Sequence, residues 1–164
     1  MGFFEVALIV AAYLCSLVAG FLFAFAVVTM PGIKRLGDRE FIRAFQVMDR
    51  VIQNNHPIFI LVWVGSAVAV IAAVVSGVGH LDGTGLALLV VAALVYLLGV
   101  QLPTVVINIP LNNTLQALDV EAMSEISREL ARQSFEPRWN RWNSIRAVLS
   151  SLASVLLIVL VRGF

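Results

Sequence analysis

A row of polar side chains in the second half of the chain has the residue types and spacing of a binding site inside a helical protein. Gln101, Thr104, Asn108 and Asn112 follow one another at intervals of three, four and four residues, so they lie on one side of a helix. Their amide and hydroxyl groups donate and accept hydrogen bonds. Because a polar amide that faces lipid is costly, we expect this first row to point into the protein interior.

A second polar row lies in the segment EPRWNRWNSIR. Trp139, Asn143 and Arg146 share one helical face, and Trp142 lies beside it. The guanidinium group of Arg146 donates hydrogen bonds in several directions, so it could bind the amide oxygens of the first row. The motif NNHP, which contains Asn55 and His56, lies at the same predicted depth in the membrane and could add a third polar group.

Each of these groups also has a purely structural explanation. Amides in membrane helices often form hydrogen bonds between helices, which contribute about 0.6 kcal/mol on average. Tryptophans anchor helices at a membrane surface, and an arginine one turn inside can extend toward the headgroups. Three polar groups are expected at one depth. This convergence supports a shared binding site about as strongly as the points above support a purely structural role.

The elements that must position these residues are transmembrane helices. Of the 164 residues, 60% are hydrophobic and 13% are charged. Soluble domains are usually about 45–50% apolar and about 25% charged. We therefore predict one all-α domain over residues 1–164, an integral membrane four-helix bundle. Its four apolar runs each suit a hydrocarbon core of about 30 Å; they cover residues 6–28, 58–78, 86–107 and 145–161.

The charges predict how the bundle lies in the membrane. Ten of the eleven Lys and Arg residues lie in the two long connections or at the start of the fourth span, whereas the connection GHLDGTG has none. By the positive-inside rule, both long connections are cytoplasmic and both termini face outward. This explanation accounts for the cations, so we predict membrane lipids and no nucleic acid as partners.

The two long connections are predicted to be amphipathic helices, interfacial or cytoplasmic, over about 38–54 and 114–135. In the first of them, Phe41 and Phe45 lie on one face, and Gln46 lies with the arginines on another. The second connection could instead project from the membrane as an extension of the third helix.

Prolines suggest that the chain contains two similar halves. Pro57 follows Pro31 by 26 residues, and Pro137 follows Pro110 by 27. The spacing is compatible with a duplicated helical hairpin and also with chance. Pro110 should kink the third helix, as should Pro103, and Pro137 suits the first turn of the fourth helix.

Several kinds of chemistry are excluded by what the spans lack. His56 and His80 lie about 36 Å apart along one helix, so they cannot share a metal. No carboxylate lies inside any predicted span, which argues against a di-metal site and a proton-coupled transporter. We therefore predict no metal site. The polar residues stop about halfway through the membrane, so a channel is the least favoured class.

The motifs together resemble the anthrone oxygenase-like family of small four-helix membrane proteins, many of whose bacterial members form a domain of unknown function. The resemblance rests on NxPxNxxL from Asn108 and WxxWNxxR from Trp139, with MPG and FQVMDRVIQNNHPIF earlier in the chain. It implies oxidation of a lipophilic polycyclic phenol by O2 without a metal or organic cofactor.

The resemblance leads to specific expected roles. His56 would be the base, because the ordinary pKa of histidine, near about 6.5, suits proton removal. Three side chains would stabilise the anionic substrate oxygen: Arg146, Asn108 and Asn112. The remaining candidates would bind substrate: Trp139, Trp142, Asn143, Gln101, Thr104 and Asn55. Trp139 and Trp142 would stack on its rings.

Two hypotheses remain open at this point. An oxygenase predicts a cavity between the polar rows. A non-catalytic bundle that binds a lipophile or a partner protein predicts that Arg146 and the asparagines are satisfied only by one another.

Overall fold

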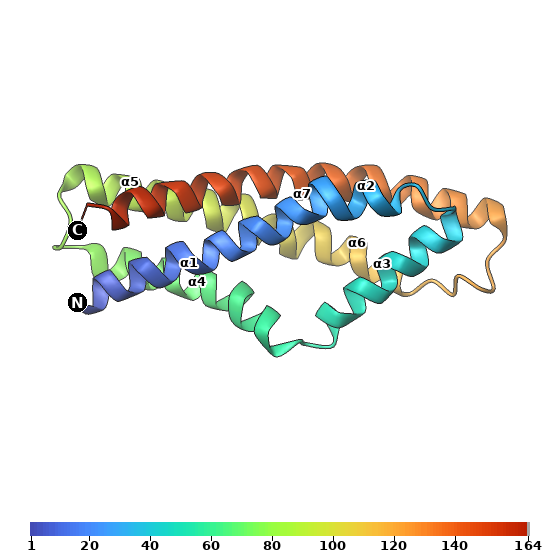
Figure 1. Ribbon diagram of the computed structural model, residues 1–164, viewed down its shortest axis with the longest axis horizontal. Coiled ribbons are helices and arrows are strands. Elements are labelled where there is room, and N and C mark those ends of the chain that lie inside the picture. Colours follow the sequence, from blue (N-terminus) through green and yellow to red (C-terminus); the bar gives the residue numbers. More distant parts are fainter. Residues whose placement is uncertain (164) are drawn as a thin grey trace.

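The computed structural model describes residues 1–163 and shows an elongated bundle of helices (Figure 1). Four helical segments are long and apolar enough to cross a membrane, which confirms the predicted four-helix membrane bundle. Three of them are much longer than the predicted spans. The elements are α1 (Phe3–Ala24), η1 (Phe25–Thr29), α2 (Met30–Ile33), α3 (Asp38–Gln53), α4 (Pro57–Gly77), α5 (Gly83–Tyr96), η2 (Leu97–Gln101), η3 (Thr104–Asn108), α6 (Ile109–Gln116) and α7 (Glu125–Val161).

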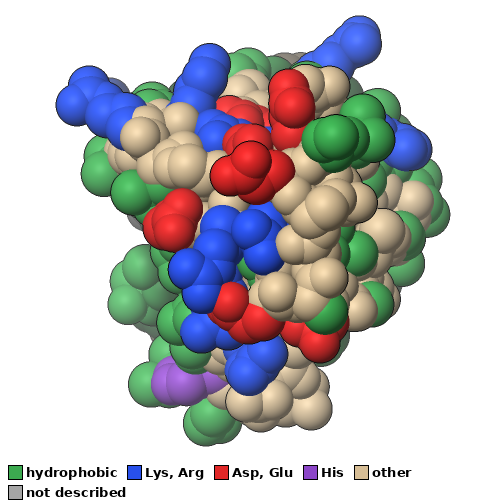
Figure 2. Space-filling view, turned by 90° about the vertical axis from the view of Figure 1, so that its right-hand side faces the viewer, with side chains coloured by type: hydrophobic (Ala, Val, Ile, Leu, Met, Phe, Trp, Pro, Cys, Tyr) green, Lys and Arg blue, Asp and Glu red, His purple; other side chains and the backbone are tan. Residues whose placement is uncertain are grey.

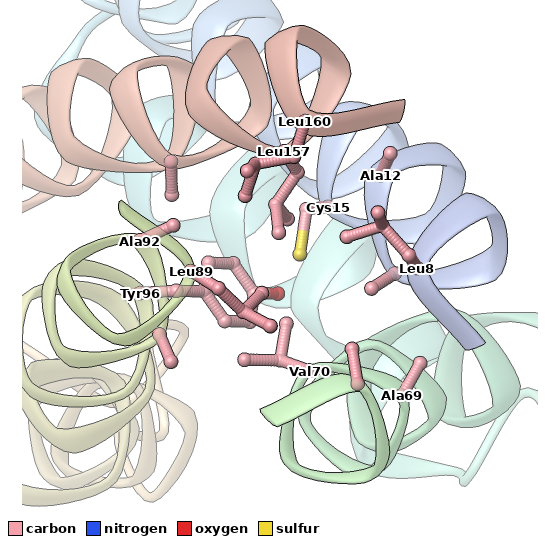
Figure 3. Close-up of a cluster of buried hydrophobic side chains, with 14 of the residues drawn as sticks. Leu8, Ala12, Cys15, Ala69, Val70, Leu89, Ala92, Tyr96, Leu157 and Leu160 are labelled. Carbon is pink, nitrogen blue, oxygen red and sulfur yellow. The ribbon is translucent and has the colours of Figure 1, made fainter. Parts of the chain in front are cut away.

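The apolar core lies near the end of the bundle that carries both termini. Leu8 and Cys15 of α1, Val70 of α4, Leu89 of α5 and Leu157 of α7 are fully buried there. Figure 3 shows these side chains pointing toward one another from the four helices. Several alanines in the same cluster let the helix backbones approach closely.

A second core lies toward the opposite end of the bundle, where α3 packs against α6 and α7. Phe41 and Phe45 of α3 are buried there against Leu115 and Phe135. Gln46 was expected on the polar face, but it is buried and donates to the carbonyl oxygens of Leu115 and Leu118 at 2.9 and 3.0 Å. The C-terminal carbonyls of a helix lack partners within it, so Gln46 completes the end of α6.

The second connection differs from the helix expected over residues 114–135. Helix α6 ends at Gln116, and α7 begins at Glu125. Between them, the Asp119 carboxylate accepts hydrogen bonds from two backbone amides, and Ser124 caps α7. These are turn and cap contacts that compete with helix. The early start of α7 places Pro137 inside the helix, whereas we expected it in the first turn.

The chain breaks sharply between α3 and α4. Asn55 has φ of 56°, in the left-handed region that asparagine tolerates at helix ends. His56 precedes Pro57 and adopts ψ of 119°, as expected for a residue before proline. In Figure 1 this junction lies well away from α7.

Three π-helical segments precede prolines. Each segment ends two residues before Pro31, Pro103 or Pro110, and the residue before the proline donates to the carbonyl five positions back. A proline lacks an N–H, and its ring clashes with the carbonyl four residues earlier, so a wider turn relieves the clash. The matching segments before Pro31 and Pro110 agree with a duplicated hairpin, which stays a prediction.

Candidate functional site

A cavity of about 550 Å³ lies beside the α3–α4 junction. Its walls come from both halves of the chain, with contributions from α1, η1, α3, α4, η2, η3, α6 and α7. Much of the wall is aromatic: Phe21, Phe25, Phe45, Phe59 and Trp63. Phe59 and Trp63 stack with their ring centroids 5.4 Å apart at 15°. The volume and the aromatic lining suit an apolar aromatic ligand.

Arg146 lines this cavity, and burying its charge costs more free energy than burying any other group of the lining. The residue is 3% exposed. Its guanidinium donates to the Thr104 hydroxyl at 2.8 Å, to the Asn143 amide oxygen at 3.3 Å and to the Trp142 carbonyl at 3.4 Å. Within residues 1–163 no carboxylate forms an ion pair with it. A buried charge without a partner is strongly unfavourable, so this site is suited to an anion.

Asn108 lines the same cavity and is 2% exposed. In the described part of the chain, both its amide nitrogen and its amide oxygen are buried without a hydrogen-bond partner. Leaving a buried polar group unsatisfied costs about 1–3 kcal/mol. Its amide is therefore free to donate to a ligand, next to the positive charge of Arg146.

A hydrogen-bonded network on the α3 side of the cavity centres on Asp49, a residue that the sequence analysis missed. The carboxylate is 4% exposed and accepts from Asn112 and Gln53, at 2.7 Å each, and from Gln116 at 3.2 Å. The amide oxygen of Asn112 accepts in turn from the Trp139 indole at 2.8 Å. Asn112 therefore links the two polar rows and has fewer free groups than expected.

Most of the predicted site residues lie around the cavity. Those that line it are Arg146, Asn108, Asn112, Trp139, Asn143, Gln101, Thr104 and Asn55. Gln101 donates to the Trp63 carbonyl and to the Tyr96 hydroxyl, at 3.2 Å each. Lining residues are a matter of geometry, and the roles assigned to them stay predictions.

Two predicted site residues lie outside the cavity lining. His56 is exposed, and its backbone carbonyl accepts from the Ile60 amide at the start of α4. The chain reverses at Asn55, which itself lines the cavity, and the next residue, His56, lies outside the lining. Trp142 is half-buried, and its carbonyl, not its ring, takes part in the network.

Charged side chains gather at the end of the molecule farthest from the termini, as Figure 2 shows. Arg39 and Arg43 of α3 pair with Glu121 in the α6–α7 connection. The hydrogen bond from Arg39 lowers the pKa of the Glu121 carboxyl. Arg132 of α7 pairs with Asp38 at 2.9 Å. These pairs join α3 to the elements across the bundle, which holds the α3 wall of the cavity in place.

Comparison with known protein families shows the family to which the chain belongs. The model of the anthrone oxygenase family matches residues 48–156, about two thirds of the chain. The chain belongs to the anthrone oxygenase family. No curated protein and no solved structure matches it. The resemblance seen in the sequence is therefore confirmed at the level of the family, and the matched segment includes the whole polar lining of the cavity.

In this anthrone oxygenase family member, the polar side-chain groups that line the cavity within residues 1–163 are amides, two indoles, one hydroxyl, one carboxylate and one guanidinium. Within residues 1–163 no three His, Cys, Asp or Glu side chains lie together as metal ligands would. The site can bind an anionic or hydrogen-bonding ligand against aromatic walls.

Proposed function

We propose that the protein is an oxygenase that oxidises a lipophilic polycyclic phenol of the anthrone class with O2. The observation that carries this proposal is a buried Arg146 that has no counter-ion among residues 1–163. It lines an aromatic cavity together with Asn108, whose buried amide has no partner among the same residues. An aromatic ketone that becomes an anion during its reaction supplies the missing negative charge.

The chemistry needs a base and an anion-stabilising site. An anthrone carries a methylene carbon opposite its ketone, and loss of one proton gives an enolate whose charge collects on the ketone oxygen. This anion reduces O2 by one electron, and the two radicals combine to form a carbon–oxygen bond. Loss of water then leaves a quinone, so one oxygen atom of O2 enters the product and the other leaves as water. Donors fixed around the ketone oxygen lower the energy of the anion.

The rim of the cavity supports access from the membrane. Ile60 and Val64 of α4 and Val105 and Ile109 of η3 and α6 line the cavity, and all four are exposed. An apolar rim that faces lipid admits a flat lipophilic substrate without first passing it through water. We further propose that the charged end of the bundle is cytoplasmic and that both termini face outward, because the cations gather at that end.

Turnover of emodin anthrone by purified protein in detergent tests the proposal. We expect quinone formation above the uncatalysed background, and a loss of about 100- to 1,000-fold in kcat for Arg146→Ala, as for removal of one oxyanion donor. Arg141→Ala is the matched control, because Arg141 is an exposed arginine on the same helix. His56→Ala tests whether the base is His56, which lies outside the cavity lining, or a group inside the cavity. If the base lies inside the cavity, this variant should keep nearly wild-type turnover.

A non-catalytic bundle that binds a lipophile or a partner protein is the alternative. This alternative requires the asparagines to form their hydrogen bonds with one another and with Arg146, whereas Asn108 has no hydrogen-bond partner among the described residues. Binding of emodin anthrone without quinone formation above background would favour this alternative. Equal turnover by wild type and Arg146→Ala would remove Arg146 from the mechanism.

A further inference from the structure

Among the described residues, the cavity is lined by one buried carboxylate, that of Asp49. The proposed reaction needs a base, and this carboxylate is placed where a base is required. The reaction requires a base, and His56 is exposed outside the lining. We propose that the carboxylate of Asp49 removes the proton from the substrate carbon, an inference that rests on the proposed function. Asp49 lines the cavity and is 4% exposed.

The hydrogen bonds of Asp49 leave room for one more partner. Oδ1 accepts from the side-chain amide of Asn112, and Oδ2 accepts from those of Gln53 and Gln116. A carboxylate has about four acceptor sites, so Oδ1 keeps one free. The three amide donors also fix the orientation of the carboxylate in the cavity wall.

The two buried charges of the cavity are separate from each other. Asp49 belongs to α3 and Arg146 to α7, and no ion pair joins them within the described chain. A neutral acid bound between them can give its proton to the carboxylate while its negative charge develops beside the guanidinium. A site with Asp49 alone would accept the proton but would not stabilise the anion. A site with Arg146 alone would stabilise the anion but would not accept the proton.

The proton can be followed through the whole reaction. Asp49 takes it from the methylene carbon, and the C–H electron pair becomes the enolate. After the enolate has reduced O2 and the carbon–oxygen bond has formed, Asp49 returns the proton to the outer peroxide oxygen. The carboxylate then removes the second C–H proton as the O–O bond breaks, and the released hydroxide takes this proton and leaves as water. Asp49 ends ionised, ready for another substrate.

Asn112 is a positioning residue in this account. It donates to Asp49 at 2.7 Å and accepts from the Trp139 indole at 2.8 Å. Asn112 thereby fixes the carboxylate relative to Trp139, an aromatic side chain of the cavity wall.

Deuterium exchange at the substrate methylene isolates the proposed step. Emodin anthrone is incubated with protein in D2O without O2, and its exchange is followed by mass spectrometry. We expect Asp49→Asn to slow the catalysed exchange by at least about 100-fold, the usual contribution of a general base. Binding of the product emodin, read from tryptophan quenching, should persist. Glu40→Gln is the matched control on α3, because Glu40 is an exposed acid that lies outside the lining.

A second variant decides the case if Asp49→Asn does not fold or bind. Asp49→Ala leaves a space beside three amide donors, and added formate should restore exchange there but not in Arg146→Ala. Wild-type exchange in Asp49→Asn, or no rescue in a folded Asp49→Ala, would overturn the role of Asp49 alone. Absence of both exchange and oxidation in the wild type would instead overturn the proposed function.

Discussion

At the scale of single residues, the most informative side chain is Asn108, because its amide is buried without a partner among residues 1–163. A protein selected only for stability would replace such a group by an apolar one of similar shape, at little or no cost. Its presence in the cavity that Arg146 also lines is explained if a ligand completes its hydrogen bonds.

We predict that Asn108→Leu stabilises the ligand-free protein by about 1–3 kcal/mol, because it removes an unsatisfied amide. Asn143→Leu is the matched comparison and should be destabilising, since the Asn143 amide donates to the Leu22 carbonyl and accepts from Arg146. Thermal unfolding in detergent measures both. A lower melting temperature for Asn108→Leu would show that Asn108 already has a structural role.

Sequence alone located part of the site. The spacing of the first polar row placed Thr104 and Asn108 on one face, because a helical period fixes which residues share a side. Asp49 was missed, since an acid among arginines on an amphipathic helix usually faces water. One signal was available: Asp49 continues the four-residue spacing of Phe41 and Phe45, the face that α3 buries.

At the scale of elements, the α3–α4 break and the π-helical segments shape the cavity. The two ends of the break, Gln53 and Pro57, lie close to the ends of the segments expected over residues 38–54 and 58–78. Asparagine and proline punctuate a helix locally, so sequence suffices there. The end of α6 at Gln116 was not predicted, because in the sequence Asp119 and Ser124 are indistinguishable from ordinary exposed polar residues. Only the structure shows that their side chains accept hydrogen bonds from nearby backbone amides.

The left-handed conformation of Asn55 provides a test at this scale. Asn55→Val should destabilise the fold by about 1–2 kcal/mol, because a β-branched residue is strained at φ of 56°. Asn55→Gly should be at least as stable as the wild type, since glycine adopts this conformation freely. Chemical denaturation of the two variants in mild detergent measures the difference. Equal stability of the two would mean that the break is held by other contacts.

At the scale of the whole molecule, the bundle continues beyond its apolar spans. Hydropathy located the four membrane helices, but it could not show that α3, α6 and the first half of α7 form a second core. Such a core depends on contacts between amphipathic segments far apart in the chain, which no local pattern records. The cavity lies where the two cores meet, lined by members of both.

The proposed orientation predicts which end of the bundle can be labelled from outside a cell. Thr84 lies in the first turn of α5, the helix that begins beside the termini in Figure 1, and Ser134 lies in the first third of α7, whose start is at the opposite end; both residues are exposed. A membrane-impermeant maleimide should label Thr84→Cys in intact cells, and Ser134→Cys only after lysis. The native Cys15 is buried and gives little background. The reverse pattern would invert the orientation.

We propose that the cavity turns a neutral aromatic ketone into an anion beside Arg146. The most direct measurement is the visible absorption spectrum of emodin anthrone bound without O2 at neutral pH. We predict the spectrum of the deprotonated anthrone in the wild type and in Arg141→Ala, and that of the neutral molecule in Arg146→Ala. A neutral spectrum in the wild type, or the same anion spectrum in Arg146→Ala, would contradict the account.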